Sequence, residues 1–183
     1  MPTFAYRIAV IAMLSAAVTG GCTTTATSTP GNAASAAQTA QSPPPIDPAF
    51  VTRANSACVP YKKWNDTHPN GVPIAGFNVN HPDPRILVQA ADWFDKVPLY
   101  HTFTPTIAAL GQPTTGIQSW TALTNEVDRL QQDWTVQIEA ARRGDAATWT
   151  KQFNDEGILT AQISLDLTKL GFTADEPCAQ LFG

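Results

Sequence analysis

Charge is nearly absent from the first 46 residues of this 183-residue chain, where Arg7 is the only acidic or basic side chain. The rest of the chain holds ten Lys and Arg residues against fifteen Asp and Glu residues, a net charge of about −5 without Arg7. Nucleic-acid binding requires a basic surface. We therefore expect no nucleic-acid partner.

Apolar runs long enough to cross a bilayer are also lacking. The segment "IAVIAMLSAAV", residues 8–18, has eleven residues, whereas a membrane-spanning helix needs about 20. A short apolar run behind a basic start, followed by small residues, is typical of a secretory signal. Residues 1–21 are therefore predicted to be a signal peptide.

The residues that follow the apolar run, "VTGGC", place two glycines directly before Cys22. This pattern resembles the lipobox of bacterial lipoproteins, in which the cysteine receives diacylglycerol and the signal is cleaved before it. The resemblance implies that Cys22 carries lipid, including acyl chains such as palmitate. Two or more such chains suffice to anchor a protein stably to a membrane. Thr19 stands where the family favours Leu or Val, so ordinary cleavage to a soluble secreted product is the alternative.

Large apolar residues are missing between Thr23 and Ile46, where only Ile46 is one. A segment of this composition does not bury enough apolar surface to offset the entropy of ordering. Residues 22–46 are therefore predicted to form a lipidated cysteine and a disordered tether, with a reach of roughly 25–30 Å. The folded domain is expected over residues 47–183.

Cysteine is scarce, with only Cys22, Cys58 and Cys178 in the chain. If Cys22 carries lipid, the other two form an even set, and such a pair is expected to oxidise outside the cytosol. We predict one disulfide bond that fastens the two ends of the folded domain, with two separate buried thiols as the alternative.

Helical periodicity dominates residues 47–183. Asp47-Pro48, Asp83-Pro84 and Thr104-Pro105 each place a capping oxygen before a proline suited to the first helical position. Pro60 is expected to end or bend the first helix, and Pro98 to break the second. Strand signals are poor, because the one candidate, "GVPIAGFNVN", contains a proline and glycines.

The longest periodic segment covers residues 116–143, where Thr115 and Gln118 fit a capping box. Gly144 is predicted to end this helix, and Asp145 to cap the next one, which Gly171 closes. So short a loop forces the two helices to lie antiparallel. We therefore predict an all-α fold, an irregular antiparallel four-helix bundle with its second helix broken near Pro98 and closed by one disulfide.

Enzymatic signatures are missing as well: the chain has no G-x-S-x-G, P-loop, G-x-G-x-x-G, H-E-x-x-H or C-x-x-C sequence. The connection over residues 61–84 holds His68 and His81, but their spacing fits no metal-ligand pattern, and "HPNG" and "HPDP" are typical of turns. We therefore expect no catalytic residues, no metal site and no cofactor.

Tryptophan, in contrast, is plentiful, with five residues. Four of them fall on predicted inward stripes: Trp93, Trp120, Trp134 and Trp149. The simpler interpretation is that these four tryptophans pack in the core of the bundle. The alternative is a pocket between helices for an apolar ligand, since bundles can hold such sites between facing helices.

Taken whole, the chain resembles the small exported lipoproteins of actinobacteria, with a lipobox, an Ala/Thr/Pro-rich tether and a disulfide-closed helical domain. The resemblance implies a lipid-anchored protein on the extracytoplasmic face of the cell membrane. We expect a non-enzymatic binding or interaction module with an unidentified envelope protein as partner. The alternative is a carrier or sensor of an apolar ligand held between the helices.

Overall fold

A computed structural model describes residues 45–69 and 71–183. The predicted signal peptide and the predicted lipid site at Cys22 lie outside these residues. The described part of the chain forms helices and contains no strand. The helices are α1 (Pro48–Thr67), α2 (Pro84–Phe94), α3 (Leu99–Ala108), α4 (Ile117–Arg143), α5 (Ala146–Leu170) and α6 (Pro177–Phe182).

Three aspartates begin helices as the sequence predicts. Asp47 accepts a hydrogen bond from the Phe50 amide, Asp83 from the Arg85 amide and Asp145 from the Thr148 amide. Each bond satisfies a backbone donor that the first turn of a helix leaves unpaired. Gly144 and Gly171, the predicted closing glycines, both adopt the left-handed conformation.

Two other helix-start predictions are wrong. Thr104 and Pro105 lie inside α3, which begins at Leu99 after Pro98. The capping box at Thr115 does not form, because Gly116 occupies the cap position of α4 without a side-chain hydrogen bond. Thr115 instead donates from Oγ1 to the Pro45 carbonyl at 3.1 Å.

Of the two outcomes predicted for Pro60, an end or a bend of the helix, the end is wrong, because α1 continues through Pro60 to Thr67. Tertiary contacts hold the last two turns in place. The Tyr61 hydroxyl lies 2.7 Å from the Thr106 hydroxyl and 3.0 Å from that of Thr102, both on α3. Such contacts offset the backbone hydrogen bond that a proline removes. The long connection is therefore shorter than predicted, because residues 61–67 belong to α1.

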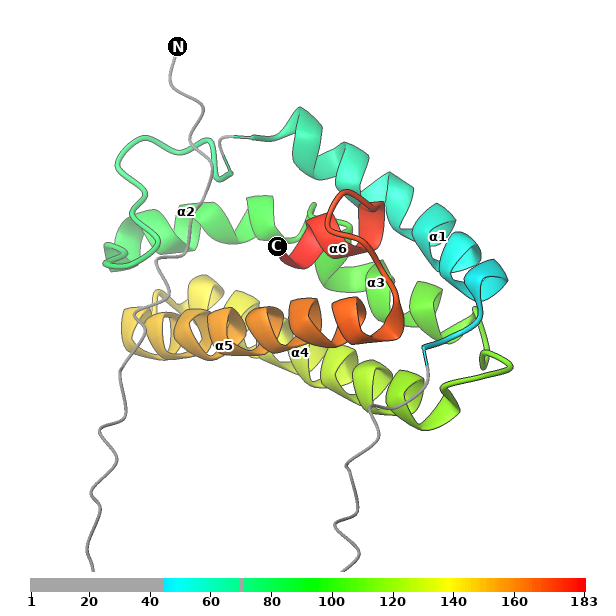
Figure 1. Ribbon diagram of the computed structural model, residues 1–183. Coiled ribbons are helices and arrows are strands. Elements are labelled where there is room, and N and C mark those ends of the chain that lie inside the picture. The colour runs from blue at the N-terminus through cyan, green and yellow to red at the C-terminus, as the bar shows by residue number, and fades with distance from the viewer. Residues whose placement is uncertain (1–44, 70) are drawn as a thin grey trace, which may run out of the picture. The chain divides into compact units, whose positions relative to one another are not determined.

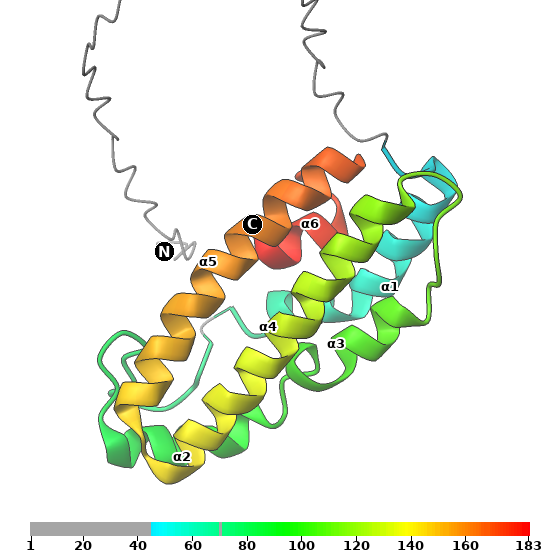
Figure 2. The same ribbon diagram turned by 90° about the horizontal axis from the view of Figure 1, so that it is seen from below.

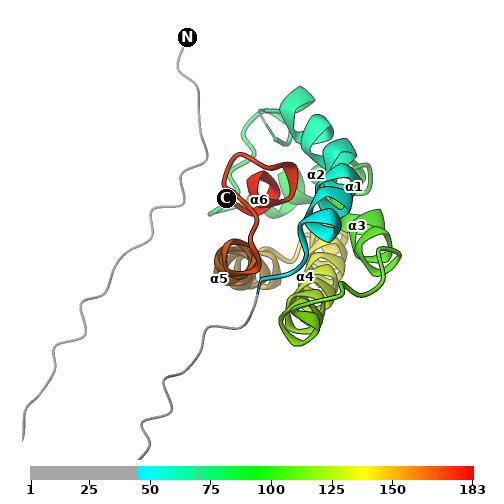
Figure 3. The ribbon, with the colours of Figure 1, turned by 45° about the vertical axis from the view of Figure 1, so that its right-hand side comes forward.

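The break near Pro98 is confirmed, since residues 95–98 separate α2 from α3. α4 packs against α5, α2 and α3, and a two-residue turn at Gly144 and Asp145 reverses the chain between α4 and α5 (Figure 2). α1 packs against α3 and α6, and α6 packs against α5. Figure 1 shows the short α6 between α1 and α5, a helix that the sequence did not predict. In Figure 3, α5 lies at one edge of the helical domain.

The core consists of two apolar clusters. The larger one joins α1, α3, the first two thirds of α4, the second half of α5 and α6. The smaller one joins α2 to the end of α4 and the start of α5, and the loop residues Val72, Ile74, Phe77 and Val79 cover it. No described helix is both long and apolar enough to cross a membrane.

The predicted disulfide bond is confirmed. Cys58 on α1 is bonded to Cys178 on α6, with 5.1 Å between their Cα atoms. Both residues are buried, and the Cys178 amide donates to the Asn55 side chain at 3.2 Å. The bond therefore fastens the C-terminal helix to the first helix of the domain.

Candidate functional site

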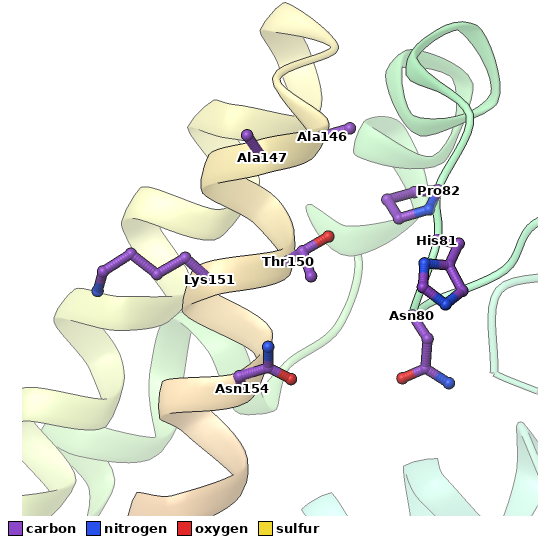
Figure 4. A pocket seen from close by; sticks show the side chains of 8 residues that line it. All are labelled: Asn80, His81, Pro82, Ala146, Ala147, Thr150, Lys151 and Asn154. Carbon is purple, nitrogen blue, oxygen red and sulfur yellow. The ribbon is translucent and has the colours of Figure 1, made fainter.

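An open groove of about 710 Å³ lies between the connection that precedes α2 and the first turns of α5. In Figure 4 the two walls face each other, one from residues 80–82 and one from α5. The lining residues are Asn80, His81, Pro82, Ala146, Ala147, Thr150, Lys151 and Asn154.

The loop wall is held in place by side chains beneath it. The Asn78 side chain accepts hydrogen bonds from the amides of Asn80 and His81, at 3.0 and 3.3 Å. Trp149, buried on α5, donates from its indole nitrogen to the Val79 carbonyl at 3.3 Å. An Asx turn and an indole anchor together fix the backbone of residues 78–81 against α5.

The helix wall begins at a sharp turn. Gly144 has φ +65°, and a Cβ at this position would lie 3.0 Å from the Pro84 carbonyl oxygen, so only glycine allows α4 to approach α2 this closely. Asp145 then caps α5. Its hydrogen bonds to Thr148 lower the pKa of the Asp145 carboxyl. α5 is therefore aligned with the loop wall from its first residue.

The chemistry of the groove is that of hydrogen bonding. Two carboxamides, an imidazole and a hydroxyl line it, and Pro82 with the two alanines adds apolar surface, whereas the Lys151 side chain extends away from the loop wall (Figure 4). Lys151 is paired with Asp155, one turn further along α5, and this bond raises the pKa of Lys151. The groove thus offers both donors and acceptors but little free charge.

The histidines of the predicted 61–84 connection lie in different surroundings. His68 stacks on Trp64 with 4.1 Å between ring centroids, and its Nδ1 lies 2.9 Å from the Trp64 carbonyl oxygen. His81 lies in the groove. Within the described residues, no group of three or more His, Cys, Asp or Glu side chains is arranged to hold a metal ion.

The four tryptophans proposed to line a ligand pocket are divided between the two clusters. Trp120 and Trp134 are buried in the larger cluster, whereas Trp149 is buried in the smaller one, with Trp93 partly exposed beside it. The apolar cavity next to Trp120 has a volume of about 20 Å³. Ligand pockets are usually about 300–1,000 Å³, so this cavity does not hold a drug-sized molecule.

A half-buried carboxyl group lies between α4 and α5. Glu156 accepts a hydrogen bond from the Trp134 indole nitrogen at 2.8 Å. Burial raises the pKa of Glu156, and the nearby Asp133 raises it further, although the Trp134 bond opposes both effects. The Gln137 side chain, buried on α4, faces the same carboxyl and also lowers its pKa. This polar layer specifies how α4 and α5 meet rather than forming an accessible site.

Sequence reasoning did not identify the groove. Thr150, Lys151 and Asn154 lie on the face of α5 opposite its apolar stripe, where polar residues are the ordinary case. Their only distinguishing signal is that this face begins directly opposite a turn-rich connection. A scan against protein-family models, a search of curated proteins and a search of solved structures found no significant match to this chain.

Proposed function

We propose that this protein is a lipid-anchored protein of the cell envelope that acts as a non-enzymatic binding module, with the polar groove at the start of α5 as its binding surface. The observation that carries the proposal is the groove itself. It presents amide, hydroxyl and imidazole groups on two walls fixed by Asn78, Trp149 and Asp145. Preorganised walls reduce the entropy lost when a partner binds.

Cysteine usage supports the anchor. Cys58 and Cys178 are bonded to each other, which leaves Cys22 as the remaining cysteine of the chain. Cys22 stands in the lipobox-like "VTGGC" after a short apolar run, and an uncharged segment separates it from the domain. We infer that diacylglycerol on Cys22 holds the protein at the extracytoplasmic face of the cell membrane.

The place where the chain enters the domain suits this role. The Ile46 amide donates to the Leu170 carbonyl at 3.3 Å, at the C-terminal end of α5. The groove lies at the other end of this 25-residue helix, roughly 35 Å away at 1.5 Å per residue. The groove therefore lies far from residues 45–46, where the described chain enters the domain.

We also infer that the domain is an irregular antiparallel four-helix bundle in which α2 and α3 count as one broken helix. The packing pairs support a closed ring, because α5 packs on α4, α4 on α3, α3 on α1, α1 on α6 and α6 on α5. α6 then fills the gap between the first and last long helices, and the disulfide bond keeps it there. The alternative, a carrier or sensor of an apolar ligand, has less support, because the two hollows that Trp120 lines have volumes of about 20 and 210 Å³, below the about 300–1,000 Å³ of a usual ligand pocket.

The anchor is tested by replacing Cys22. We expect C22S to lose incorporation of an alkyne-labelled fatty acid and to move from the membrane fraction to the soluble exported fraction. Thr24→Ser is the matched control and should stay lipidated. The anchor is contradicted if the wild-type protein takes up no labelled fatty acid and is recovered in the soluble fraction.

The groove is tested with a photoreactive amino acid in intact cells. A probe at Thr150 should give an adduct of one defined mass, whereas a probe at Gln132, exposed on α4, should not. Asn80→Ala should reduce the adduct, since it removes a donor and an acceptor from the facing wall. Equal labelling from both positions, or none from Thr150, would exclude the groove as the binding surface.

A further inference from the structure

The outer face of α5 carries a regular stripe that the domain itself does not cover. Seven exposed residues follow one another at alternating spacings of four and three: Ala147, Lys151, Asn154, Ile158, Ala161, Leu165 and Thr168. Ile158 is 73% exposed and Leu165 is 59% exposed, although both are large aliphatic side chains. Their spacing of seven places them on the same side of the helix, two turns apart.

This spacing is that of a coiled-coil seam, in which apolar residues recur every 3.5 positions and face a second helix. α5 already buries its other face, which includes Trp149, Leu159, Ile163 and Leu167. The outer stripe is therefore a second seam on the same helix. Its apolar part covers residues 158–168, and its polar part, residues 147–154, belongs to the groove.

We propose that the outer face of α5 pairs with α5 of a second copy of this chain, antiparallel and related by a two-fold axis. One register brings large residues against small ones. In it Leu165 lies against Ala161 of the second copy, and Ile158 lies against Thr168 of the second copy. Pairing large with small residues lets the two helices interdigitate.

Charge complementarity selects the same register. Asp155 and Lys169 flank one side of the stripe, where they pair within α5 with Lys151 and Asp166. An antiparallel arrangement about Gln162 brings Asp155 opposite Lys169 of the second copy, so each gains a further partner of opposite charge. Two-fold symmetry forms this ion pair twice. A shift by one heptad would instead place Asn154 against Leu165 and Lys151 against Thr168, and a parallel pair would place Lys151 beside Lys151. Both alternatives bury polar groups without partners or bring like charges together.

The interface between the two α5 helices is small, so the dimer is weak in dilute solution. The helices overlap over residues 155–169, about 21 Å of helix, which is less contact than a stable standard-size interface provides. The pairing does not depend on the groove or on lipid. Where the proposed anchor is present, confinement to a membrane raises the effective concentration and favours the dimer.

Cysteine cross-linking of the full-length protein in its own membranes tests the geometry. The two Gln162 residues face each other across the axis, so Q162C should form a covalent dimer under mild oxidation. I158C should not, because its neighbour is Thr168 rather than a second residue 158. Stronger cross-linking of I158C, or none of Q162C, would overturn the proposal. The chain without an added cysteine is the control, and a dimer there would report a free Cys22 and so a failure of the anchor instead.

A charge swap tests the register. In the Q162C background, D155K and K169D should each reduce the covalent dimer about three- to tenfold, because each places like charges together twice. The double variant D155K/K169D should restore the dimer. Asp92→Lys, on the exposed side of α2, changes the net charge by as much as D155K does and should leave the amount of covalent dimer unchanged. Failure of the double variant to restore the dimer would exclude this register.

Discussion

At the scale of single residues, Glu156 is a carboxyl group whose pKa the fold raises. It is a carboxyl between two packed helices, with the Trp134 indole as hydrogen-bond donor. Burial raises its pKa, and the Asp133 charge raises it further. The folded state therefore favours the neutral form of Glu156, and the charged form costs free energy in proportion to the pKa difference, about 1.4 kcal/mol per unit.

Glu156→Gln is expected to stabilise the fold at neutral pH. The folded pKa lies above the unfolded value, so the unfolded state releases the proton first, and the wild-type protein loses stability as pH rises from the unfolded pKa through the folded one. The glutamine keeps an oxygen that accepts from Trp134 but never becomes charged. Urea unfolding between pH 4 and 8 should show a growing advantage for E156Q as pH rises.

The exposed substitution Asp92→Asn serves as the control for lost charge and should show no such trend. A constant difference between E156Q and the wild type across this pH range would contradict a raised pKa at Glu156. Such a constant difference in stability would mean that the substitution acts through packing alone.

At the scale of elements, glycine has opposite roles at two positions around α5. Gly144 adopts a left-handed conformation and leaves no room for a side chain beside Pro84. Gly157 lies inside α5, where an added Cβ would meet nothing within 4 Å. The first glycine is required by the turn that sets the groove. The second is a cost that the helix carries without a structural need.

The same change should therefore have opposite effects at these two positions. Gly157→Ala is expected to stabilise the protein by about 0.5–1 kcal/mol, the helix-propensity difference between the two residues. Gly144→Ala is expected to destabilise it by more than about 1–2 kcal/mol, the cost of the left-handed conformation alone. Chemical denaturation of both variants checks this prediction. It is wrong if the two variants shift stability in the same direction.

At the scale of the whole molecule, the disulfide bond closes the helical domain. It joins residues 120 apart in the sequence and holds α6 between α1 and α5. A bond that closes so long a loop restricts the unfolded chain, and removal of a native disulfide typically costs about 2–5 kcal/mol. We therefore expect the position of α6 to depend on this bond, which persists in an oxidising environment.

The double variant C58A/C178A is expected to remain helical but to unfold about 2–5 kcal/mol more easily. Hydrogen exchange should increase most in α6, which has only six residues and relies on its neighbours. Guanidinium unfolding and amide exchange against the wild-type protein measure the two effects. Unchanged protection of α6 would show that packing alone positions this helix.

Local patterns in the sequence were enough to predict the helical class, the three aspartate caps, the closing glycines, the break near Pro98 and the pairing of Cys58 with Cys178. These features follow from local rules, because capping, periodicity and cysteine arithmetic act over a few residues or need only a count. The tertiary structure alone decided that α1 passes through Pro60 to reach α3, that α4 starts at Gly116 rather than at a capping box, and that the tryptophans separate into two clusters. It also brought residues 80–82 to the polar face of α5. Each of these outcomes depends on contacts between distant segments, whose energies exceed the local preferences that the sequence displays.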